Sequence, residues 1–287
     1  MGPHPYQRFV ADVARLSREG KRLPLGGLAP APRPTLAPNA PRVLIFAPHP
    51  DDECIIGGLP LRLLRESKMR VVNVALTQGS NKERQAGRLV ELEGACAFLG
   101  FDLATTRPGG LERVNPKTRA QDPAHWKTCV DVIARIIATH LPRVVFVPHD
   151  ADHNSTHIGA HHLVMDALAA QPVGFSCHVV ETEFWGALGR PNLMVELSEA
   201  DVGDLVAATS FHVEEVERNP YHLLLPAWMQ DNVRRGSELV GDQGGAAPDF
   251  AFSTLYRARR YGGGKIEDAW TGGRQLGRND DPAGLFT

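Results

Sequence analysis

Four short runs of mainly apolar residues, none of which alternates regularly between apolar and polar positions, constrain the fold of this chain most strongly. A strand with this pattern is buried on both faces, whereas a strand with one solvated face alternates. Between the runs, apolar residues recur every three or four positions, which is the spacing of an amphipathic helix. The runs span residues 43–47, 71–76, 101–105 and 143–147, and the helical segments span 55–68, 83–99, 126–140 and 157–169.

This alternation predicts an α/β fold. We expect a three-layer sandwich in which a mostly parallel, Rossmann-like sheet is covered by helices on both faces, with right-handed crossovers. Beyond residue 172 the alternation fades. There the pattern favours a strand at 179–184, a helix at 198–211 capped by Ser198, a helix at 221–239 and a Gly-rich turn at 241–248.

The chain divides into three parts by composition. Residues 1–41 predict a helix at 6–21 followed by a Pro-rich arm, which either lies over the domain or reaches a neighbouring subunit of a homo-oligomer. Residues 42–262 form the predicted α/β domain. Residues 263–287 are a polar, Gly-rich tail that we expect to be frayed. The segment 107–124 is longer than a usual connection and predicts a functional loop or irregular packing.

Charge and hydropathy exclude several classes of function. The net charge of −2 provides no strong basic field, so we expect no nucleic-acid partner. No apolar run reaches the roughly 20 residues of a membrane span. Residues 1–22 lack the apolar centre of a secretory signal, which predicts a cytoplasmic location. The four isolated cysteines are typical of reduced thiols, and their spacing does not indicate a structural zinc site.

A cluster of ionisable residues follows the first predicted strand directly. It holds His49, Asp51, Asp52 and Glu53 within five positions. Ligands in open α/β sheets bind at the carboxyl ends of the strands, and imidazole and carboxylate groups are good ligands for a divalent metal. The alternative is a polar turn in which Asp51 or Asp52 caps a helix.

A second group of histidines follows the strand at 143–147. The segment 148–162 contains His149, His153, His157 and an adjacent pair, His161 and His162. In a parallel sheet this segment starts at the same edge as His49, so both loops can contribute ligands to one ion. We expect His161 and His162 to be helix-surface or packing residues.

Four motifs of the chain resemble the LmbE-like or PIG-L family of zinc-dependent N-acetylglucosaminyl deacetylases and related amidases. The resemblance covers residues 42–164. The motifs are His49-Pro50-Asp51-Asp52-Glu53 with Gly57-Gly58, Thr77-Gln78-Gly79, Arg88-x-x-Glu91-x-x-x-Ala95-x-x-x-Leu99-Gly100, and Asp152-x-Asn154-x-Thr156-His157.

The resemblance implies three zinc ligands, His49, Asp52 and His157, with Asp51 as the general base. It also places Arg88 on the substrate side of the cleft. Asn154 stands where many relatives have an oxyanion-stabilising histidine; its amide can donate a hydrogen bond but cannot carry a proton.

Several alternatives remain open. His149 or His153 is a second candidate for the oxyanion role, and His153 is a rival third ligand. Glu53 is expected to support the site without binding metal. His212 faces the substrate or is structural, and Trp185 stacks on a sugar or packs in the core.

These features predict a hydrolase that removes an N-acyl group from an amino sugar or a small conjugate of one. The resemblance implies that this acyl group is acetyl. Water activated by Zn²⁺, or by another divalent metal, would attack the amide with Asp51 as base and acid. One alternative is an amidase acting on another small-molecule amide, such as a thiol conjugate or a natural product. The other is a non-catalytic metal- or ligand-binding module.

Overall fold

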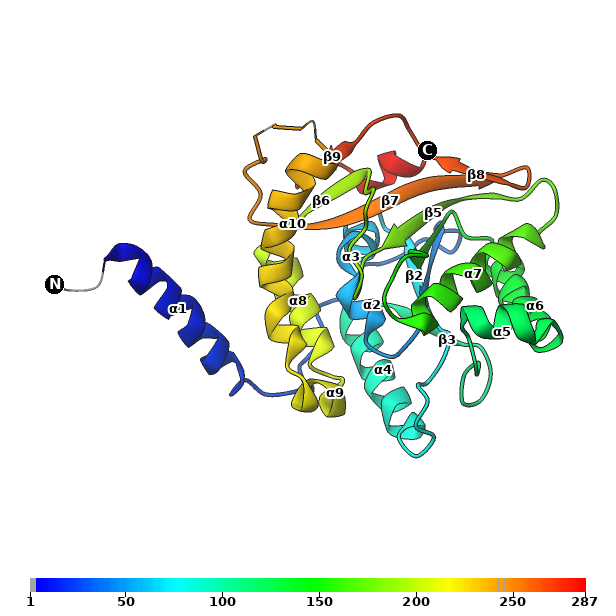
Figure 1. Ribbon diagram of the computed structural model, residues 1–287, viewed down its shortest axis with the longest axis horizontal. Coiled ribbons are helices and arrows are strands. Elements are labelled where there is room, and N and C mark those ends of the chain that lie inside the picture. Colours follow the sequence, from blue (N-terminus) through cyan, green and yellow to red (C-terminus); the bar gives the residue numbers. More distant parts are fainter. Residues whose placement is uncertain (1–3, 242, 245) are drawn as a thin grey trace.

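The parallel half of the predicted sheet is present in the computed structural model, which describes residues 4–241, 243–244 and 246–287. Within these residues a nine-stranded sheet has the order β3-β2-β1-β4-β5-β7-β6-β9, and β8 pairs with β7 (Figure 1). Strands β3, β2, β1, β4 and β5 are mutually parallel. Their bounds are Arg42–Ala47 for β1, Arg70–Ala75 for β2, Asp102–Thr105 for β3, Val144–Pro148 for β4 and Ser176–Thr182 for β5. The prediction of a mostly parallel α/β sheet is confirmed.

Helices cover both faces of this sheet, as strands without alternation require. In β1, Val43 and Ile45 join one core with α3, α4, α8 and α10, while Leu44 and Phe46 join the other with α6 and α7. Figure 1 shows these two groups of helices on opposite sides of the strands. The bounds are Gly58–Arg65 for α3, Gln85–Leu99 for α4, Pro123–His140 for α6, Ser155–Ala169 for α7, Glu199–Thr209 for α8 and Leu225–Leu239 for α10.

Two segments of this region differ from the expected pattern. The helix predicted at 55–68 begins later, as α3 at Gly58, because a separate short helix, α2 (Asp52–Ile55), ends in a turn at Ile56 and Gly57. The long connection at 107–124 contains a helix, α5 (Pro116–Gln121), whose N-cap Asn115 accepts a hydrogen bond from the backbone of Thr118 at 2.9 Å. A side-chain cap of this kind starts a helix even in a Pro- and Gly-rich connection.

The C-terminal third completes the sheet with antiparallel pairs. Strand β7 (Phe252–Gly262) lies between β5 and β6 (Leu193–Leu197) and is antiparallel to both. The expectation of a frayed tail is wrong, because β8 (Lys265–Asp268) and β9 (Arg274–Leu276) pair within the sheet and the helix η2 (Pro282–Phe286) buries Phe286. The fully buried Arg62 holds this tail by donating hydrogen bonds to the carbonyls of Gly277 and Asp280.

The connections in this third also carry short helices. They are α9 (Val213–Arg218) and η1 (Tyr221–Leu224), and η1 leads directly into α10. Ser198 caps α8 as predicted, with its hydroxyl accepting from the backbone of Asp201 at 3.1 Å. Positions 242 and 245 of the predicted Gly-rich turn lie outside the described residues.

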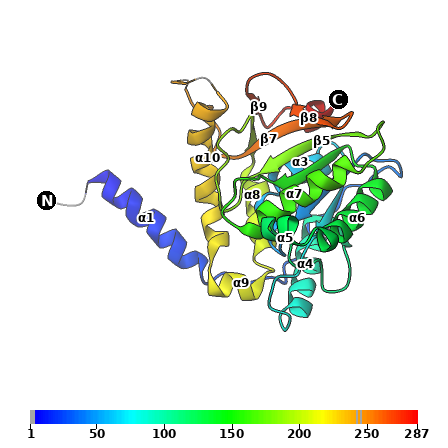
Figure 2. The ribbon, with the colours of Figure 1, turned by 45° about the vertical axis from the view of Figure 1, so that its right-hand side comes forward.

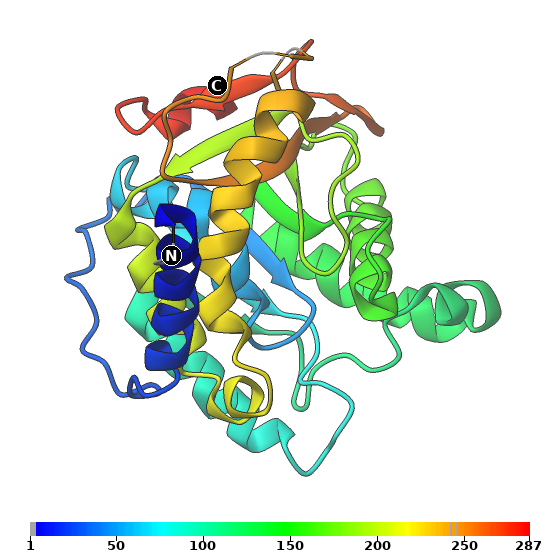
Figure 3. The ribbon, with the colours of Figure 1, turned by 60° about the vertical axis from the view of Figure 1, so that its left-hand side comes forward.

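The N-terminal helix α1 (Pro5–Gly20) is present as predicted, and the arm that follows it lacks regular structure. Figures 1 and 2 show α1 projecting from the body, and Figure 3 views the molecule from the side on which it lies. None of its residues is buried. Of the helices in the described ranges, none is long and apolar enough to cross a membrane.

Candidate metal centre

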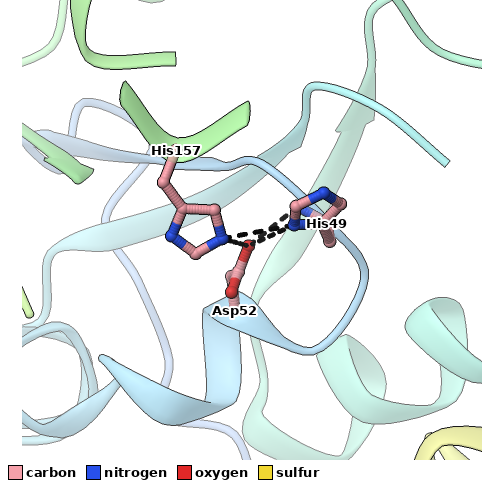
Figure 4. Close-up of side chains that lie close together, drawn as sticks. All are labelled: His49, Asp52 and His157. Atoms are coloured by element: carbon pink, nitrogen blue, oxygen red, sulfur yellow. Dashed lines mark hydrogen bonds and ion pairs between the residues drawn. The ribbon is translucent and has the colours of Figure 1, made fainter. Parts of the chain in front are cut away.

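The structure brings His49, Asp52 and His157 together at the carboxyl edge of the parallel strands (Figure 4). His49 lies in the loop after β1, Asp52 is the first residue of α2, and His157 lies in the first turn of α7. His49 Nδ1 is 3.2 Å from His157 Nε2, and Asp52 Oδ2 is 3.5 Å and 3.4 Å from these two nitrogens. Two loops more than 100 residues apart therefore present three donor atoms to one point.

The spacing of the three donors fits a divalent metal. Two ligands bound at about 2.0–2.1 Å in a tetrahedral arrangement lie roughly 3.3–3.4 Å apart, which is close to all three observed separations. Two imidazoles and one carboxylate are a catalytic type of donor set, because they leave a coordination position free.

The surroundings of His157 support the same interpretation. Its Nδ1 atom is buried, has no hydrogen-bond partner among the residues that the structure describes, and lies 3.8 Å from Asp152 Oδ2. That carboxylate is held in place by the backbone N–H groups of Trp185 and Gly186, at 3.2 Å and 3.1 Å. A carboxylate facing the second nitrogen of a metal-binding imidazole orients the ring and selects its tautomer.

Attraction between the Asp52 carboxylate and the two imidazoles shifts the pKa values of the donors. Burial alone would raise the pKa of Asp52, but the His157 and His49 imidazoles outweigh it and hold that pKa well below its usual range. Burial alone would lower the pKa of His157, and the neighbouring Asp52 carboxylate raises it instead. The site is thus organised around a buried anion that attracts positive charge.

Asp51 lies beside this group in an unusual backbone conformation. Its φ of 114° is a region that side-chain-bearing residues rarely adopt, and its carboxylate makes no capping bond, so the alternative of Asp51 as a helix cap does not hold. Its backbone N–H donates to Glu53 Oε2 at 3.0 Å, and its Oδ2 accepts from the Tyr221 hydroxyl at 2.5 Å. Burial, and secondarily repulsion from Asp52, raises the pKa of Asp51 to about 6, which suits a group that exchanges protons near neutral pH.

Glu53 and His212 form a buried pair behind Asp51. Both side chains are fully buried, and His212 Nε2 lies 2.8 Å from Glu53 Oε1. Burial opposes a charged His212, but Glu53 outweighs it and raises the pKa of His212. His212 therefore does not line an open substrate site. The Cys54 thiol contacts the Glu53 carboxylate. Burial raises the pKa of this thiol well above its usual value, so Cys54 packs as a neutral group.

The candidates for the oxyanion role have different positions. Asn154 caps α7, with its side-chain oxygen accepting from the backbone of Thr156 at 2.8 Å, which leaves its amide nitrogen as a donor. His149 is buried with both ring nitrogens engaged, Nε2 with the carbonyl of Gly186 at 2.7 Å and Nδ1 with the backbone of Ala151. His153 is exposed. Neither histidine has a nitrogen among the clustered donors.

Arg88 supports the loop that carries Asp51. Its Nη2 donates to the carbonyl of Pro50 at 3.0 Å and lies 3.8 Å from Glu215, and its side chain is mostly buried. Contact with substrate, implied by the resemblance, remains a prediction for this residue. Of the two packing histidines, His161 is buried with Nδ1 bonded to the carbonyl of Pro148.

A polar cleft of about 380 Å³ opens next to His49. Its walls come from the segment after β2, the start of α4, the loop before α5 and the first turn of α7. Polar lining residues include Thr77, Ser80, Lys82, Gln85, Arg113 and Thr156. The long connection predicted to be a functional loop thus forms one wall of this cleft.

Sequence reasoning missed Tyr221, which contacts Asp51. It lies in η1, 170 residues from Asp51 in the chain, and no motif marks it. The sequence shows only that Tyr221 begins the helix predicted at 221–239, and that feature predicts no contact with the site.

Comparison with known proteins gives a family match for the central part of the chain. Residues 44–168 match the family model described as "PIG-L: GlcNAc-PI de-N-acetylase". The chain is 26% identical over 212 residues to a 1D-myo-inositol 2-acetamido-2-deoxy-alpha-D-glucopyranoside deacetylase of Thermobifida fusca, covering 62% of this chain and 73% of that protein.

Two solved structures show the same fold. The N,N'-diacetylchitobiose deacetylase of Pyrococcus horikoshii is 16% identical, with 90% of this chain and 94% of that chain covered and a TM-score of 0.53. GalB, the 4-carboxy-2-hydroxymuconate hydratase of Pseudomonas putida, is 17% identical, with 76% and 95% covered and a TM-score of 0.57. Structural likeness at such identities establishes the architecture and leaves the reaction to the site.

Proposed function

We propose, from the PIG-L (LmbE-like) family domain that the chain carries at residues 44–168, that this protein is a metal-dependent hydrolase that removes an N-acyl group from an amino sugar or its conjugate. The observation that carries the proposal is the convergence of His49, Asp52 and His157 with Asp51 directly beside them. The Thermobifida fusca relative, whose name describes deacetylation of an acetamido sugar, supports the same class of substrate.

The donor set would hold Zn²⁺ or another divalent ion. Such an ion supplies activation of water and polarisation of the amide carbonyl. The preference for zinc rests on the mixture of two imidazoles with one carboxylate, since purely oxygen ligands would favour magnesium or calcium.

The chain's own residues then divide the proton transfers. The Asp51 carboxylate accepts a proton from the attacking water and delivers it to the leaving nitrogen, so that the amine departs neutral. Tyr221 donates to Asp51 Oδ2, which restricts the carboxylate to one orientation. The amide nitrogen of Asn154 supplies a donor for the developing negative charge on the carbonyl oxygen.

The polar cleft next to His49 suits the sugar. Its hydroxyl, amide and charged side chains provide donors and acceptors for sugar hydroxyl groups. Arg88 supports the loop that carries Asp51, and we propose that it also contacts the sugar directly.

The test begins with purified protein stripped of metal by a chelator. Release of free amine from N-acetylglucosamine and its glycosides is measured before and after Zn²⁺, Mn²⁺ or Fe²⁺ is restored. We expect activity to return with metal, and Asp51→Asn to bind metal without turnover, while the exposed Asp150→Asn serves as the matched control. Full activity of the stripped protein, or full turnover by Asp51→Asn, contradicts the proposal. A panel of larger amides in the same assay separates a sugar deacetylase from an amidase acting on another conjugate.

A further inference from the structure

A second cavity, of about 200 Å³, is lined almost entirely by aromatic and aliphatic side chains. Phe184 and Trp185 follow β5, Tyr221 and Leu224 come from η1, and Trp228 comes from α10. The polar side-chain groups among the lining residues are the Tyr221 hydroxyl, which is bonded to Asp51, and the indole N–H groups of Trp185 and Trp228. Trp185 and Leu224 are 53% and 58% exposed, so a large apolar surface is open to solvent here.

Two side chains that line this apolar pocket also contact residues of the candidate metal centre. The Tyr221 hydroxyl reaches Asp51 Oδ2 at 2.5 Å. The ring of Phe184 packs edge-on against the ring of His157, with centroids 4.6 Å apart. A group seated in the pocket therefore contacts side chains that themselves touch the proposed base and one of the proposed ligands.

The apolar pocket and the polar cleft share no lining residue and contact different members of the site. An amide substrate likewise has two ends, an amine part and an acyl part. The hydroxyl groups of a sugar amine find hydrogen-bond partners in the polar cleft and would lose them in the apolar pocket. The acyl part is then the end that the apolar pocket receives.

We propose that the apolar pocket binds the acyl group of the substrate and that this group is larger and more apolar than acetyl, either a straight fatty acyl chain or an aryl acyl group. This inference rests on the proposed hydrolase function. An apolar cavity of roughly 150 Å³ holds a benzene molecule, so the methyl group of acetyl would leave most of this pocket unfilled. A longer chain covers the exposed Trp185 and Leu224 faces and releases water from them.

The experiment uses the full-length, metal-loaded protein and a series of N-acyl glucosamines with acetyl, butanoyl, hexanoyl and benzoyl groups. We expect kcat/KM to rise by up to about fourfold for each added methylene until the pocket is filled. Trp185→Ala and Leu224→Ala should each lower the ratio of kcat/KM for the hexanoyl and acetyl amides. Val173→Ala, which removes a side chain 90% exposed and outside the pocket, should leave that ratio unchanged.

A binding measurement keeps the pocket separate from the chemistry. In the Asp51→Asn protein, quenching of tryptophan fluorescence by the hexanoyl amide should occur at lower concentration than by the acetyl amide, and Trp185→Ala should remove this difference. Hydrolysis of the acetyl amide with no gain for longer chains and no effect of Trp185→Ala overturns the pocket assignment and leaves the hydrolase proposal standing. Failure to cleave any amide of the series refutes the hydrolase proposal, and the acyl assignment falls with it.

Discussion

Replacing Asp51 by asparagine should stabilise the metal-free protein at neutral pH while it abolishes hydrolysis. The Asp51 carboxyl is buried beside the Asp52 carboxylate, and these two causes raise its pKa from 3.8 to about 6. The folded state therefore disfavours the charged form that the unfolded chain adopts freely above pH 3.8. Holding a proposed base in this environment lowers the stability of the protein, as is common for groups that take part in catalysis.

The magnitude and its pH dependence follow from this pKa. A rise from 3.8 to about 6 corresponds to about 3 kcal/mol of lost stability, at 1.36 kcal/mol per pKa unit. The loss is absent below the unfolded pKa, grows as pH rises, and is complete above the folded pKa. Asparagine cannot ionise, so the gain in unfolding free energy should be about 3 kcal/mol at pH 7.5 and close to zero at pH 3.5.

Urea unfolding of the chelator-treated protein at these two pH values measures the effect. The metal must be removed, because a cation next to Asp51 would relieve the repulsion that the experiment detects. The exposed Asp150→Asn should change the unfolding free energy by less than about 0.5 kcal/mol at either pH. An Asp51→Asn protein that is no more stable than the parent at pH 7.5 would refute the reasoning.

Three further predictions address the surrounding residues. Zn²⁺ at 100 times its dissociation constant should stabilise the parent protein by about 2.7 kcal/mol in thermal unfolding, and His157→Ala should remove most of this gain; an equal gain in both proteins excludes His157 as a ligand. Arg88→Ala should lower kcat, because the loop that carries Asp51 loses the hydrogen bond from Arg88 to the carbonyl of Pro50. An unchanged kcat in steady-state kinetics would show that the loop keeps its active conformation without this hydrogen bond. The stabilisation that His212 gains from Glu53 should be complete below pH about 6.5 and should be lost as pH rises through the raised pKa of His212. Between pH about 6 and about 9 the unfolding free energy of His212→Gln should therefore fall less than that of the parent protein.

The parallel half of the fold could be predicted because its signals are local. Each of β1, β2 and β4 is a short apolar run, and the two that precede the site, β1 and β4, are followed at once by histidine and carboxylate residues. A parallel sheet places the ends of such strands at one edge, which predicts that the loop holding His49 and the segment 148–162 lie together, and the family resemblance selects His157 within that segment. The order of strands and helices thus predicts the meeting of the two segments, and the resemblance supplies the particular donors.

In the C-terminal third, β5, α8 and α10 lie at predicted segments, but the antiparallel strands could not be predicted because their signals depend on distant partners. Strand β7 carries Arg257, Arg259 and Arg260, and such a segment resembles an exposed turn more than a strand within a sheet. Arg259 is tolerated there because its Nη1 atom forms an ion pair with Glu181 Oε1 on the adjacent β5, at 3.0 Å. The same limit applies to Tyr221 and His212, whose partners at the site are 170 and 159 residues away in the chain.

The proposed chemistry and the proposed choice of acyl group depend on different parts of this chain. The proposed ligands and base all lie within the family match at residues 44–168, whereas six of the seven residues lining the apolar pocket lie beyond it and Ile55 alone lies inside. The fold itself does not select the reaction, since the solved structures that share it include a hydratase as well as deacetylases. A substitution in η1 or after β5 can therefore change which acyl group is accepted while the donor atoms keep their spacing. For this reason the ratio of kcat/KM between acyl groups tests the C-terminal third, and dependence on metal tests the domain that precedes it.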